Sequence, residues 1–439
     1  MRNWLKGALL STSVFGSSWV GAVSYWRATN RMPSTLDVFV WLAALPLALL
    51  LAFWLARRML AAREAQPTAP SADTLDAAPA APPALPVLAI LAAAVRTPHG
   101  ASAQELAQAA EEGRARAGLD PELVDDDGFP LMSARAPLDD LAAVRADLDT
   151  WRSSAGLADA RFSKEQWRAL ALGTAVASEL LMQANGAQLA TLRIHAVLGP
   201  DWDPAQRELA AAWLAALATQ AGWPAQQIEA TSPALSAPGL LAQLADQGGS
   251  AAIVLSFGSC IGDAGVQELA RQGVLFGPAN AQGLIPGEAA AGLLVAAAAP
   301  EGVDATALQL ASAPPAANDG GRKPEAASLR ALAERLLPGA DQAASVSAVF
   351  ADTGHRSIAL LELMKFTGAA VPHLDSGDDV TSLGAACGYA GPGAAAPWLA
   401  ALALAHQHAL DTAGAALCVG NEDPSQRTAA LVRPGTTLT

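Results

Sequence analysis

The chain has 439 residues, enough for two or three ordinary domains or for one large α/β unit with an additional segment. Hydrophobic residues make up 52% of it and charged residues 15%, which argues against extended disorder. Residues 1–65 hold seven of the 27 basic residues but only two of the 41 acidic ones, so the rest of the chain is strongly acidic. This balance argues against a nucleic acid as partner, because phosphate binding needs clustered cations.

Two apolar stretches open the chain, at residues 7–26 and 38–56. Each is close to the roughly 20 residues that a helix needs to cross a bilayer. Tryptophans near their ends and basic residues on their flanks predict a transmembrane hairpin over residues 1–60, with both termini in the cytoplasm. The alternative is a cleaved signal peptide or a single anchor within the first 26 residues.

Residues 61–86 are rich in proline and alanine, a composition typical of a semi-rigid linker. Beyond them, short apolar strand patterns alternate with longer helix patterns, which indicates a layered α/β fold. We predict strands at 86–96, 190–198, 251–257, 345–351, 415–420 and 427–432, and helices at 102–117, 164–185, 203–222, 239–246, from 357 onward and at 398–413. Residues 311–327 have the composition of a linker or crossover.

The three cysteines, Cys260, Cys387 and Cys418, form no CxxC pair and lie among small apolar residues. Buried free thiols are expected, with neither a disulfide framework nor a zinc site. His406 and His408 are two residues apart on a predicted helix, so they face different sides and do not predict a metal site. The sequence predicts no bound cofactor.

Several other polar segments have structural interpretations. His355 and His373 are expected in loops or at the edge of the core, and Gly287–Glu288 at a turn before a strand. The acidic segments Asp125–Asp127 and Asp375–Asp379 are expected to be solvated loops. The glycines of 384–393 lack the spacing and the lysine of a phosphate loop, which favours close packing or tight turns.

Three segments together resemble the thiolase/ketosynthase superfamily. They are LAILAAAVRTPHGASAQELAQAAEEG from Leu88, AAIVLSFGS with GLIPGEAAAGLLVA within residues 251–296, and TSLGAACGYAGPGAA with GAALCVGNEDPSQRTAALV from Thr381 onward. The resemblance implies two related halves, residues 87–310 and 311–439, packed as α-β-α-β-α layers.

The resemblance also implies where catalytic residues would lie. Acyl condensation needs an activated thiolate and imidazoles that handle protons and the developing oxyanion. The cysteine position falls on or near Ser232, and the two histidine positions fall on Asp352 and Thr381. We therefore expect no catalytic residues of the family kind. A triad of Ser232, a histidine and Asp352 is the remaining catalytic arrangement, but the sequence has no G-x-S-x-G motif.

The combination of hydrophobic N-terminus, Pro/Ala linker and degenerate ketosynthase-like body resembles a bacterial domain family found beside phospholipase effectors of type VI secretion. That resemblance implies a non-enzymatic adaptor at the inner membrane, whose cytoplasmic body binds a lipase effector and delivers it to the secretion spike. The alternative is a divergent enzyme that transfers or binds acyl groups.

Overall fold

The computed structural model describes residues 85–435, apart from residues 126, 139–140, 156–160, 188, 249–250, 320 and 322. The chain divides into residues 1–82 and 83–439, and the described range lies in the second unit. The predicted spans at 7–26 and 38–56, and nearly all of the predicted linker at 61–86, lie outside the described residues. No helix within the described range has both the length and the apolar composition to cross a bilayer.

Twelve strands are described. In chain order they are β1 (Val87–Arg96), β2 (Gly118–Val124), β3 (Pro130–Ser133), β4 (Leu192–Ala196), β5 (Ile228–Thr231), β6 (Ala251–Ser259), β7 (Glu288–Ala296), β8 (Thr306–Ala313), β9 (Val346–Ala351), β10 (Val380–Ser382), β11 (Ala415–Gly420) and β12 (Arg427–Pro434). Ten of them form one hydrogen-bonded sheet in the order β10-β9-β11-β12-β8-β1-β7-β6-β4-β5, and β2 pairs with β3 separately.

The large sheet is made of two halves with the same connectivity. One half contains β1 and β4 to β7, and the other contains β8 to β12. In each half the first strand pairs antiparallel with the fifth and the fifth antiparallel with the fourth. The fourth pairs parallel with the second and the second parallel with the third. The first strands, β1 and β8, pair antiparallel and join the halves. This is the duplication that the resemblance implied.

The second half starts earlier than predicted. Because β8 begins at Thr306, the predicted boundary between residues 310 and 311 falls inside a strand. The predicted linker at 311–327 is wrong at residues 311–313, because these residues form the end of β8. The alternation in TALQLASA is weak because alanine and serine carry little strand signal.

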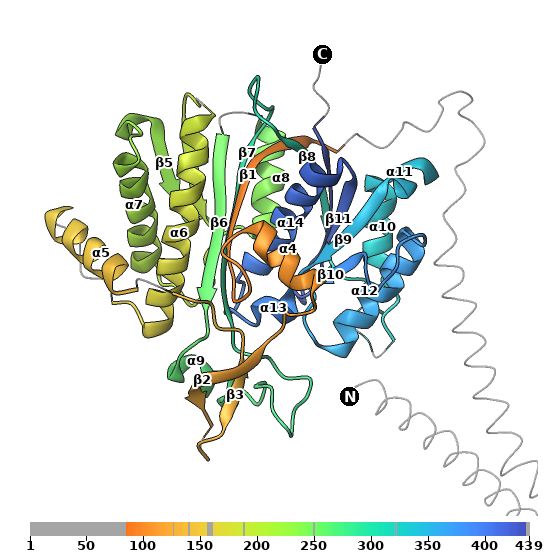
Figure 1. The fold of residues 1–439 in the computed structure, drawn as a ribbon, viewed down its shortest axis with the longest axis horizontal. Coiled ribbons are helices and arrows are strands. Elements are labelled where there is room, and N and C mark those ends of the chain that lie inside the picture. Colours follow the sequence, from red (N-terminus) through yellow and green to blue (C-terminus); the bar gives the residue numbers. More distant parts are fainter. Residues whose placement is uncertain are drawn as a thin grey trace, which may run out of the picture. The chain divides into compact units, whose positions relative to one another are not determined.

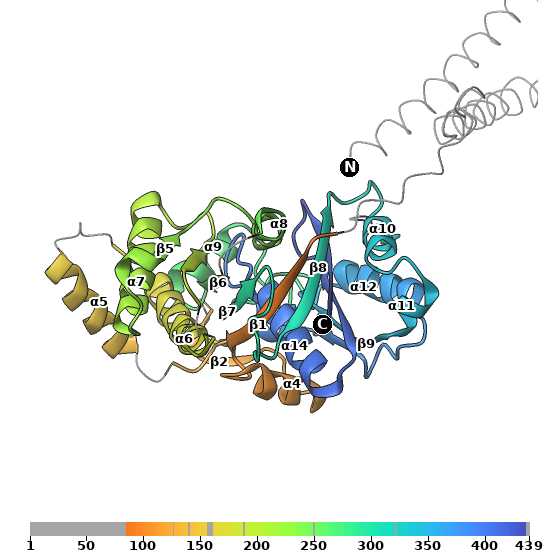
Figure 2. The same cartoon turned by 90° about the horizontal axis from the view of Figure 1, so that it is seen from above.

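The helices are α4 (Ala103–Glu111), α5 (Leu141–Ala155), α6 (Lys164–Gly186), α7 (Pro204–Gln220), α8 (Ala237–Gln247), α9 (Asp263–Arg271), α10 (Ala327–Leu336), α11 (Ala340–Ala344), α12 (Ser357–Ala370), α13 (Gly384–Cys387) and α14 (Ala396–Thr412), with a 3-10 turn η2 (Ala225–Gln227). Figures 1 and 2 show α6 and α7 outside one half of the sheet and α10 and α12 outside the other. Helices α8 and α14 lie between the halves, which gives the α-β-α-β-α layers that were predicted.

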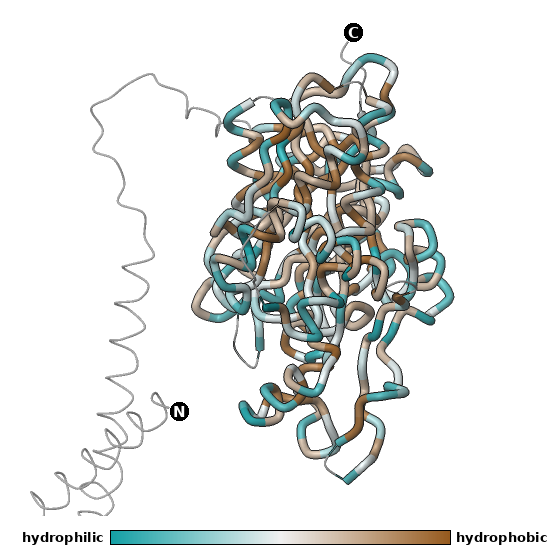
Figure 3. The backbone as a smooth tube through the Cα atoms, turned by 90° about the vertical axis from the view of Figure 1, so that its left-hand side faces the viewer, coloured by the Kyte–Doolittle hydropathy of each residue, from teal (hydrophilic) through white to brown (hydrophobic). Residues whose placement is uncertain are grey.

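Alternation along the strands separates the layers. In β6, Ala252 and Val254 pack with α8 and α14, whereas Ile253 and Leu255 pack with α6 and α7. A third cluster joins α10 and α12 to the outer face of the β8–β12 half. This period of two follows from the pleat of a strand and explains why the central strands are apolar on both faces. Figure 3 shows the apolar residues on the inner segments and the polar residues mainly on the outer loops.

Two of the long helices start at capping boxes. Asp203 caps α7 and Ser163 caps α6, each in a reciprocal capping box with a glutamine three residues later. At the start of α4, Ser102 and Glu105 form only half of such a box. The Ser102 side chain accepts from the Glu105 N–H, but the Glu105 carboxylate accepts from Ala101 instead of Ser102.

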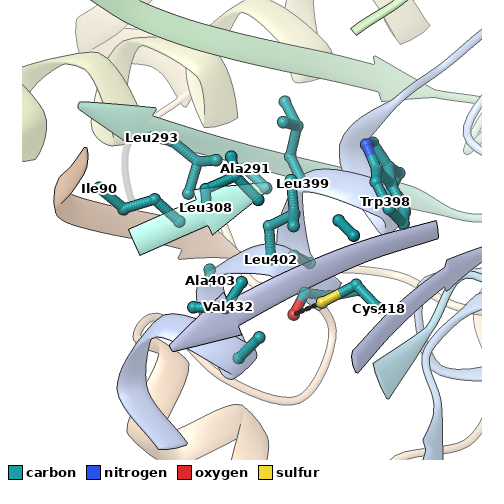
Figure 4. Packing of buried hydrophobic residues seen from close by; sticks show 14 of the residues in the cluster. Ile90, Ala291, Leu293, Leu308, Trp398, Leu399, Leu402, Ala403, Cys418 and Val432 are labelled. Carbon is teal, nitrogen blue, oxygen red and sulfur yellow. Dashed lines mark hydrogen bonds between the residues drawn. The ribbon is translucent and has the colours of Figure 1, made fainter. Parts of the chain in front are cut away.

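The central helix α14 is buried along almost its whole length and is rich in alanine. Its residues 399–405 are at most 1% exposed, and they contact strands of both halves (Figure 4). Alanine lets a helix approach two strand layers closely, because it adds only one methyl group beyond the backbone.

Ala403→Leu is expected to destabilise the fold by about 1–3 kcal/mol, because three added carbons have no space between the two strand layers. Urea unfolding of the full-length chain measures the change. The matched control is Ala205→Leu, the same substitution at an exposed position of α7, which should change stability far less. Equal stability of the two variants would contradict tight packing around α14.

Candidate functional site

A cavity of about 600 Å³ lies where the ends of β9 and β11 meet the N-termini of α8 and α14. The carboxyl ends of the parallel strands β9 and β11 reach the same edge of the sheet, a usual place for a site in α/β proteins. The wall of the cavity consists mainly of small apolar residues and glycines, with a few polar groups. The lining residues are Ser236–Pro238, Leu284, Ile285, Asp352, Gly354–Arg356, Gly384, Gly388–Ala395, Pro397, Trp398, Gly420, Glu422–Pro424, Gln426 and Thr428.

The predicted glycine-rich segment forms one wall, and its glycines serve close packing, as expected. A Cβ atom on Gly384 would lie 2.2 Å from the carbonyl oxygen of Asp352, so no larger residue fits there. Gly388 has a φ of +65°, a conformation that residues with side chains rarely adopt.

Asp352 follows β9 directly and lines the cavity. Its Oδ1 accepts hydrogen bonds from the backbone N–H groups of Asn421 at 2.9 Å and Glu422 at 3.4 Å. Its Oδ2 has no hydrogen-bond partner within the described range. Asp352 is half-buried in the cavity wall, and the loss of solvent around its carboxyl raises the pKa of Asp352 to about 7. The two backbone donors oppose the rise, while the nearby Glu422 carboxylate adds to it.

The turn after β11 is tied to the turn after β9. Asn421 accepts a hydrogen bond from the Thr353 hydroxyl at 2.6 Å and donates one to the carbonyl of Ala359 at 2.9 Å. Glu422 accepts from the Gly354 N–H at 2.6 Å and forms an ion pair with Arg356. These contacts connect the two turns beside Asp352. The positive charge of Arg356 is neutralised by Glu422.

His355 also lines the cavity, close to the ring of Phe276 at a centroid distance of 5.3 Å. Burial lowers its pKa, so the imidazole is neutral at pH 7. Its Nε2 is buried and has no hydrogen-bond partner within the described range. Trp398 is only 4% exposed, and its indole Nε1 is also buried without a hydrogen-bond partner within the described range.

The three predicted vestigial positions do not meet in the cavity. Asp352 lines it, but Ser232 lies in a separate hollow beside α7, where its hydroxyl is 3.5 Å from the Arg207 guanidinium. Thr381 lies on β10 opposite Phe350 and does not line the cavity. The serine that does line it is Ser236, the N-cap of α8, whose Oγ accepts from the Gly239 N–H.

Sequence reasoning missed Ser236, Trp398, Gly420 and Glu422 as cavity residues. Ser236 had a usable signal, since a serine followed two residues later by proline is typical of a helix start. The other three become neighbours only through the pairing of β11 with β9 and the position of α14.

The cysteines of the chain all lie within the described range, and none lines the cavity. Each thiol is buried, as predicted. Burial raises the pKa of Cys260 and of Cys387 to about 12, and that of Cys418 as well. Such thiols stay protonated at neutral pH and do not act as nucleophiles.

His373, His406 and His408 each contact one hydrogen-bonding group. The ring of His373 donates from Nε2 to the carbonyl of Val346 at 2.8 Å. His406 contacts the Thr306 hydroxyl, and His408 contacts that of Ser347, both at 2.8 Å. The two therefore point to different partners, as their spacing predicted. Within the described range, no group of three metal-ligating side chains is close enough to hold a metal ion.

Glu288 is fully buried and has a structural role. Its carboxylate forms an ion pair with Arg168 and accepts from the Ala136 N–H and the Ser259 hydroxyl, each at 2.9 Å. The preceding Gly287 has no space for a Cβ atom, which would lie 2.1 Å from the carbonyl oxygen of Cys387. This agrees with the structural interpretation of Gly287–Glu288.

The acidic segments satisfy backbone groups of their own turns. Asp125 accepts from the Phe129 N–H at 2.8 Å, and Asp375 accepts from the Gly377 N–H at 2.7 Å. These are Asx-type turns on the surface, consistent with solvated loops.

Asp352→Asn is expected to stabilise the protein at pH 8 by on the order of 1–3 kcal/mol, because the amide keeps the Oδ1 acceptor and removes a buried charge. In the wild type the native pKa of about 7 exceeds the unfolded value of 3.8. Below pH 4 both states carry the proton, and between pH 4 and 7 only the native state does. Wild-type stability therefore falls as the pH rises through this window. The Tm difference between the variant and the wild type should grow from pH 4 to pH 8, and a constant difference would contradict the raised pKa.

No family model and no curated protein matches the sequence. The fold, in contrast, matches many solved structures. One is the ishigamide ketosynthase/chain length factor, 17% identical, with a TM-score of 0.54 over 80% of this chain and 100% of that one. Another is an oxazolomycin ketosynthase domain from Streptomyces albus, 14% identical, with a TM-score of 0.56 over 80% of this chain and 75% of that one. A third is a ketosynthase module of the Bacillus subtilis bacillaene synthase, 12% identical, with a TM-score of 0.54 over 80% of this chain and 72% of that one. At this identity the likeness concerns the fold, and the described part of the chain has a ketosynthase-like layered α/β fold.

Proposed function

We propose that this chain is a non-enzymatic adaptor that uses a ketosynthase-like body to bind a protein partner. The proposed partner is a phospholipase effector of type VI secretion, held at the bacterial inner membrane through the N-terminal segment and passed to the secretion spike. The choice of partner rests on the family resemblance of the sequence. The structure supports the proposal through a cavity wall that contains no cysteine.

The observation that carries the proposal is the absence of a thiol from the cavity. All three cysteines are buried elsewhere with raised pKa values, and Ser236, Ala237 and Pro238 occupy the N-terminus of α8 at the cavity wall. Acyl condensation through a cysteine requires a thiolate that substrate can reach. The neutral His355 therefore has no thiol to activate in the cavity.

A surface suited to a protein partner lies beside the cavity. Helix α12 begins directly after His355 and Arg356 and exposes four large apolar side chains: Ile358, Leu360, Leu361 and Met364, which we call the α12 surface. Their spacing places them on one side of the helix, and each is 38–48% exposed. Clustered exposed apolar side chains are typical of protein interaction sites, unlike single ones.

The acidic composition adds to this surface. The formal net charge is −14 although residues 1–65 are basic, so the body itself carries more negative charge. Such a field favours encounter with a basic partner and increases the association rate.

The alternative, a divergent acyl-transferring or acyl-binding enzyme, has one specific observation in its favour. Ser236 lies at a helix N-terminus and lines the same cavity as His355 and Asp352. A serine hydroxyl activated by a neutral imidazole is a known acyl acceptor.

Affinity capture with the full-length chain from its native host, followed by mass spectrometry, is the direct test. Near-stoichiometric recovery of a lipase or a secretion-spike protein is expected. Recovery of acyl carrier protein, or an acyl mass on Ser232 or Ser236, would contradict the adaptor proposal and favour the enzyme.

Leu361→Asp is expected to reduce this capture at least tenfold, because a charge in the centre of the α12 surface must be desolvated on binding. The matched control is Met182→Asp on α6, which is 66% exposed and lies away from α12. Both variants should keep the wild-type Tm. Equal capture by the two variants would exclude the α12 surface as the docking site.

A further inference from the structure

The exposed side of helix α12 carries almost no charge. Besides the four residues of the α12 surface, the exposed residues of this helix are Ser357, Lys365, Gly368 and Ala369. Its one acidic residue, Glu362, is buried and paired with a buried arginine. A helix on the outside of a soluble protein normally has polar and charged residues on its exposed side. An apolar exposed side therefore indicates that something other than water covers it.

The outer layer that contains α12 lacks the negative charge of the body as a whole. Helices α10 and α12 pack over one hydrophobic cluster, and Figure 2 shows α11 beside them. The exposed charged residues of these three helices are Arg330, Arg335 and Lys365 on the basic side, and Glu334 and Asp341 on the acidic side. Anionic lipid headgroups would thus not be repelled at this layer, as they would be elsewhere on the acidic body.

The chain enters the body in the same layer. Leu85, the first described residue, packs against the cluster of α10 and α12, and its carbonyl accepts from Nε2 of Gln309 at 3.2 Å. The second predicted membrane span ends at residue 56, so residues 57–84 connect it to Leu85. A segment of this length reaches at most about 100 Å even when fully extended. Attachment at this range keeps the body concentrated beside the bilayer, so a contact that is weak by itself becomes populated.

We propose that the α12 surface lies on the lipid bilayer while no protein partner occupies it, with its apolar side chains among the headgroups and Lys365 directed to their phosphates. This contact rests on the proposed function, because it requires that the N-terminal segment is attached to a membrane. The acidic segment Asp375–Asp379 follows the C-terminal end of α12, so we expect the N-terminal half of the helix, which carries the apolar residues, to lie deeper.

Such a contact would regulate access to the α12 surface. Lipid and a protein partner cannot cover the same side chains at once, so the partner must displace the bilayer before it binds. The apolar side chains are then shielded from water in both states. This avoids a large exposed apolar patch, which would promote aggregation of the free adaptor.

The test uses the full-length chain in liposomes of phosphatidylcholine and phosphatidylglycerol, with a cysteine at the α12 surface labelled by the polarity-sensitive dye NBD. The labelled variant is Leu360→Cys. The native cysteines are buried and protonated, so they should not react, and the unsubstituted chain checks this. The matched control is Met182→Cys on α6, which replaces an exposed apolar residue on the other half of the sheet.

Emission of the dye in Leu360→Cys should shift to shorter wavelength in liposomes. Phosphatidylcholine with brominated acyl chains should quench it several-fold more than it quenches the dye in Met182→Cys. A shift without this quenching would mean that protein covers the α12 surface, and emission without a shift would mean that water does. Either result overturns the contact with the bilayer.

A second substitution checks the chemistry of the contact. Leu361→Asp, added to the labelled Leu360→Cys chain, places a charge that is costly to desolvate in the centre of the α12 surface. Quenching should fall to the level of the Met182→Cys control, while the circular dichroism spectrum stays that of the wild type. Undiminished quenching in this double variant would contradict docking through the apolar side chains.

Flotation of the liposomes separates this contact from the proposed function. A chain that does not float with the liposomes would contradict the membrane attachment and, with it, both proposals. A chain that floats but whose dye at Leu360→Cys is not quenched would overturn only the contact of α12 with lipid. The adaptor proposal would then still stand on the capture of its partner.

Discussion

The close packing of α14 between the two halves of the sheet is the constraint on which the rest of the structure depends. This helix contacts strands of both halves, and the alanines along it set how near those strands can lie. Its N-terminus, with Trp398, is also part of the cavity wall. A larger residue in the middle of α14 would therefore disturb the separation of the layers and the shape of the cavity together. The composition of the chain, in which alanine dominates the apolar content, reflects this requirement.

The cavity is organised by two turns that follow neighbouring strands of the sheet. The paired turns after β9 and β11 hold Asp352 through backbone donors, and Glu422 and Arg356 neutralise each other beside it. What results is a half-buried carboxyl with a raised pKa in a wall of mainly small residues and glycines. Within the described range, the side chains that line this wall include no cysteine thiol.

The sequence predicts the long, capped helices and the buried strands well. Helix α6 was predicted at 164–185 and spans Lys164–Gly186, and α14 was predicted at 398–413 and spans Ala396–Thr412. Helix α6 has a capping box at Ser163, whereas α14 has no side-chain cap and shows itself in the sequence as a long apolar run. Strand β5 has four residues, and β8 is rich in small residues, so neither carries a signal that stands out from a loop.

The site was harder to predict than the fold. Asp352 was singled out because the family resemblance places a histidine position there, and the structure places it directly after β9 in the cavity wall. Ser232 was located by counting back from β6, and this counting depends on the length of the loop between β5 and α8. The structure has Ser236 at the helix start instead, four residues further on. Asp352 and Trp398 line the same cavity although they are far apart in the sequence, and no local pattern predicts that they meet.

The repeated connectivity of the sheet has a consequence for how the chain folds. In each half the first strand pairs with the last strand of that half, which lies far away in the sequence. Ala89 of β1 pairs with Ala296 of β7, and Thr306 of β8 pairs with Pro434 of β12. Such non-local pairing makes folding slow, since long loops must close before the contacts form. During synthesis, β1 leaves the ribosome long before either of its neighbours exists. An apolar strand with unpaired edges at that stage is prone to aggregate, which makes nascent chains of this protein a natural substrate for chaperones.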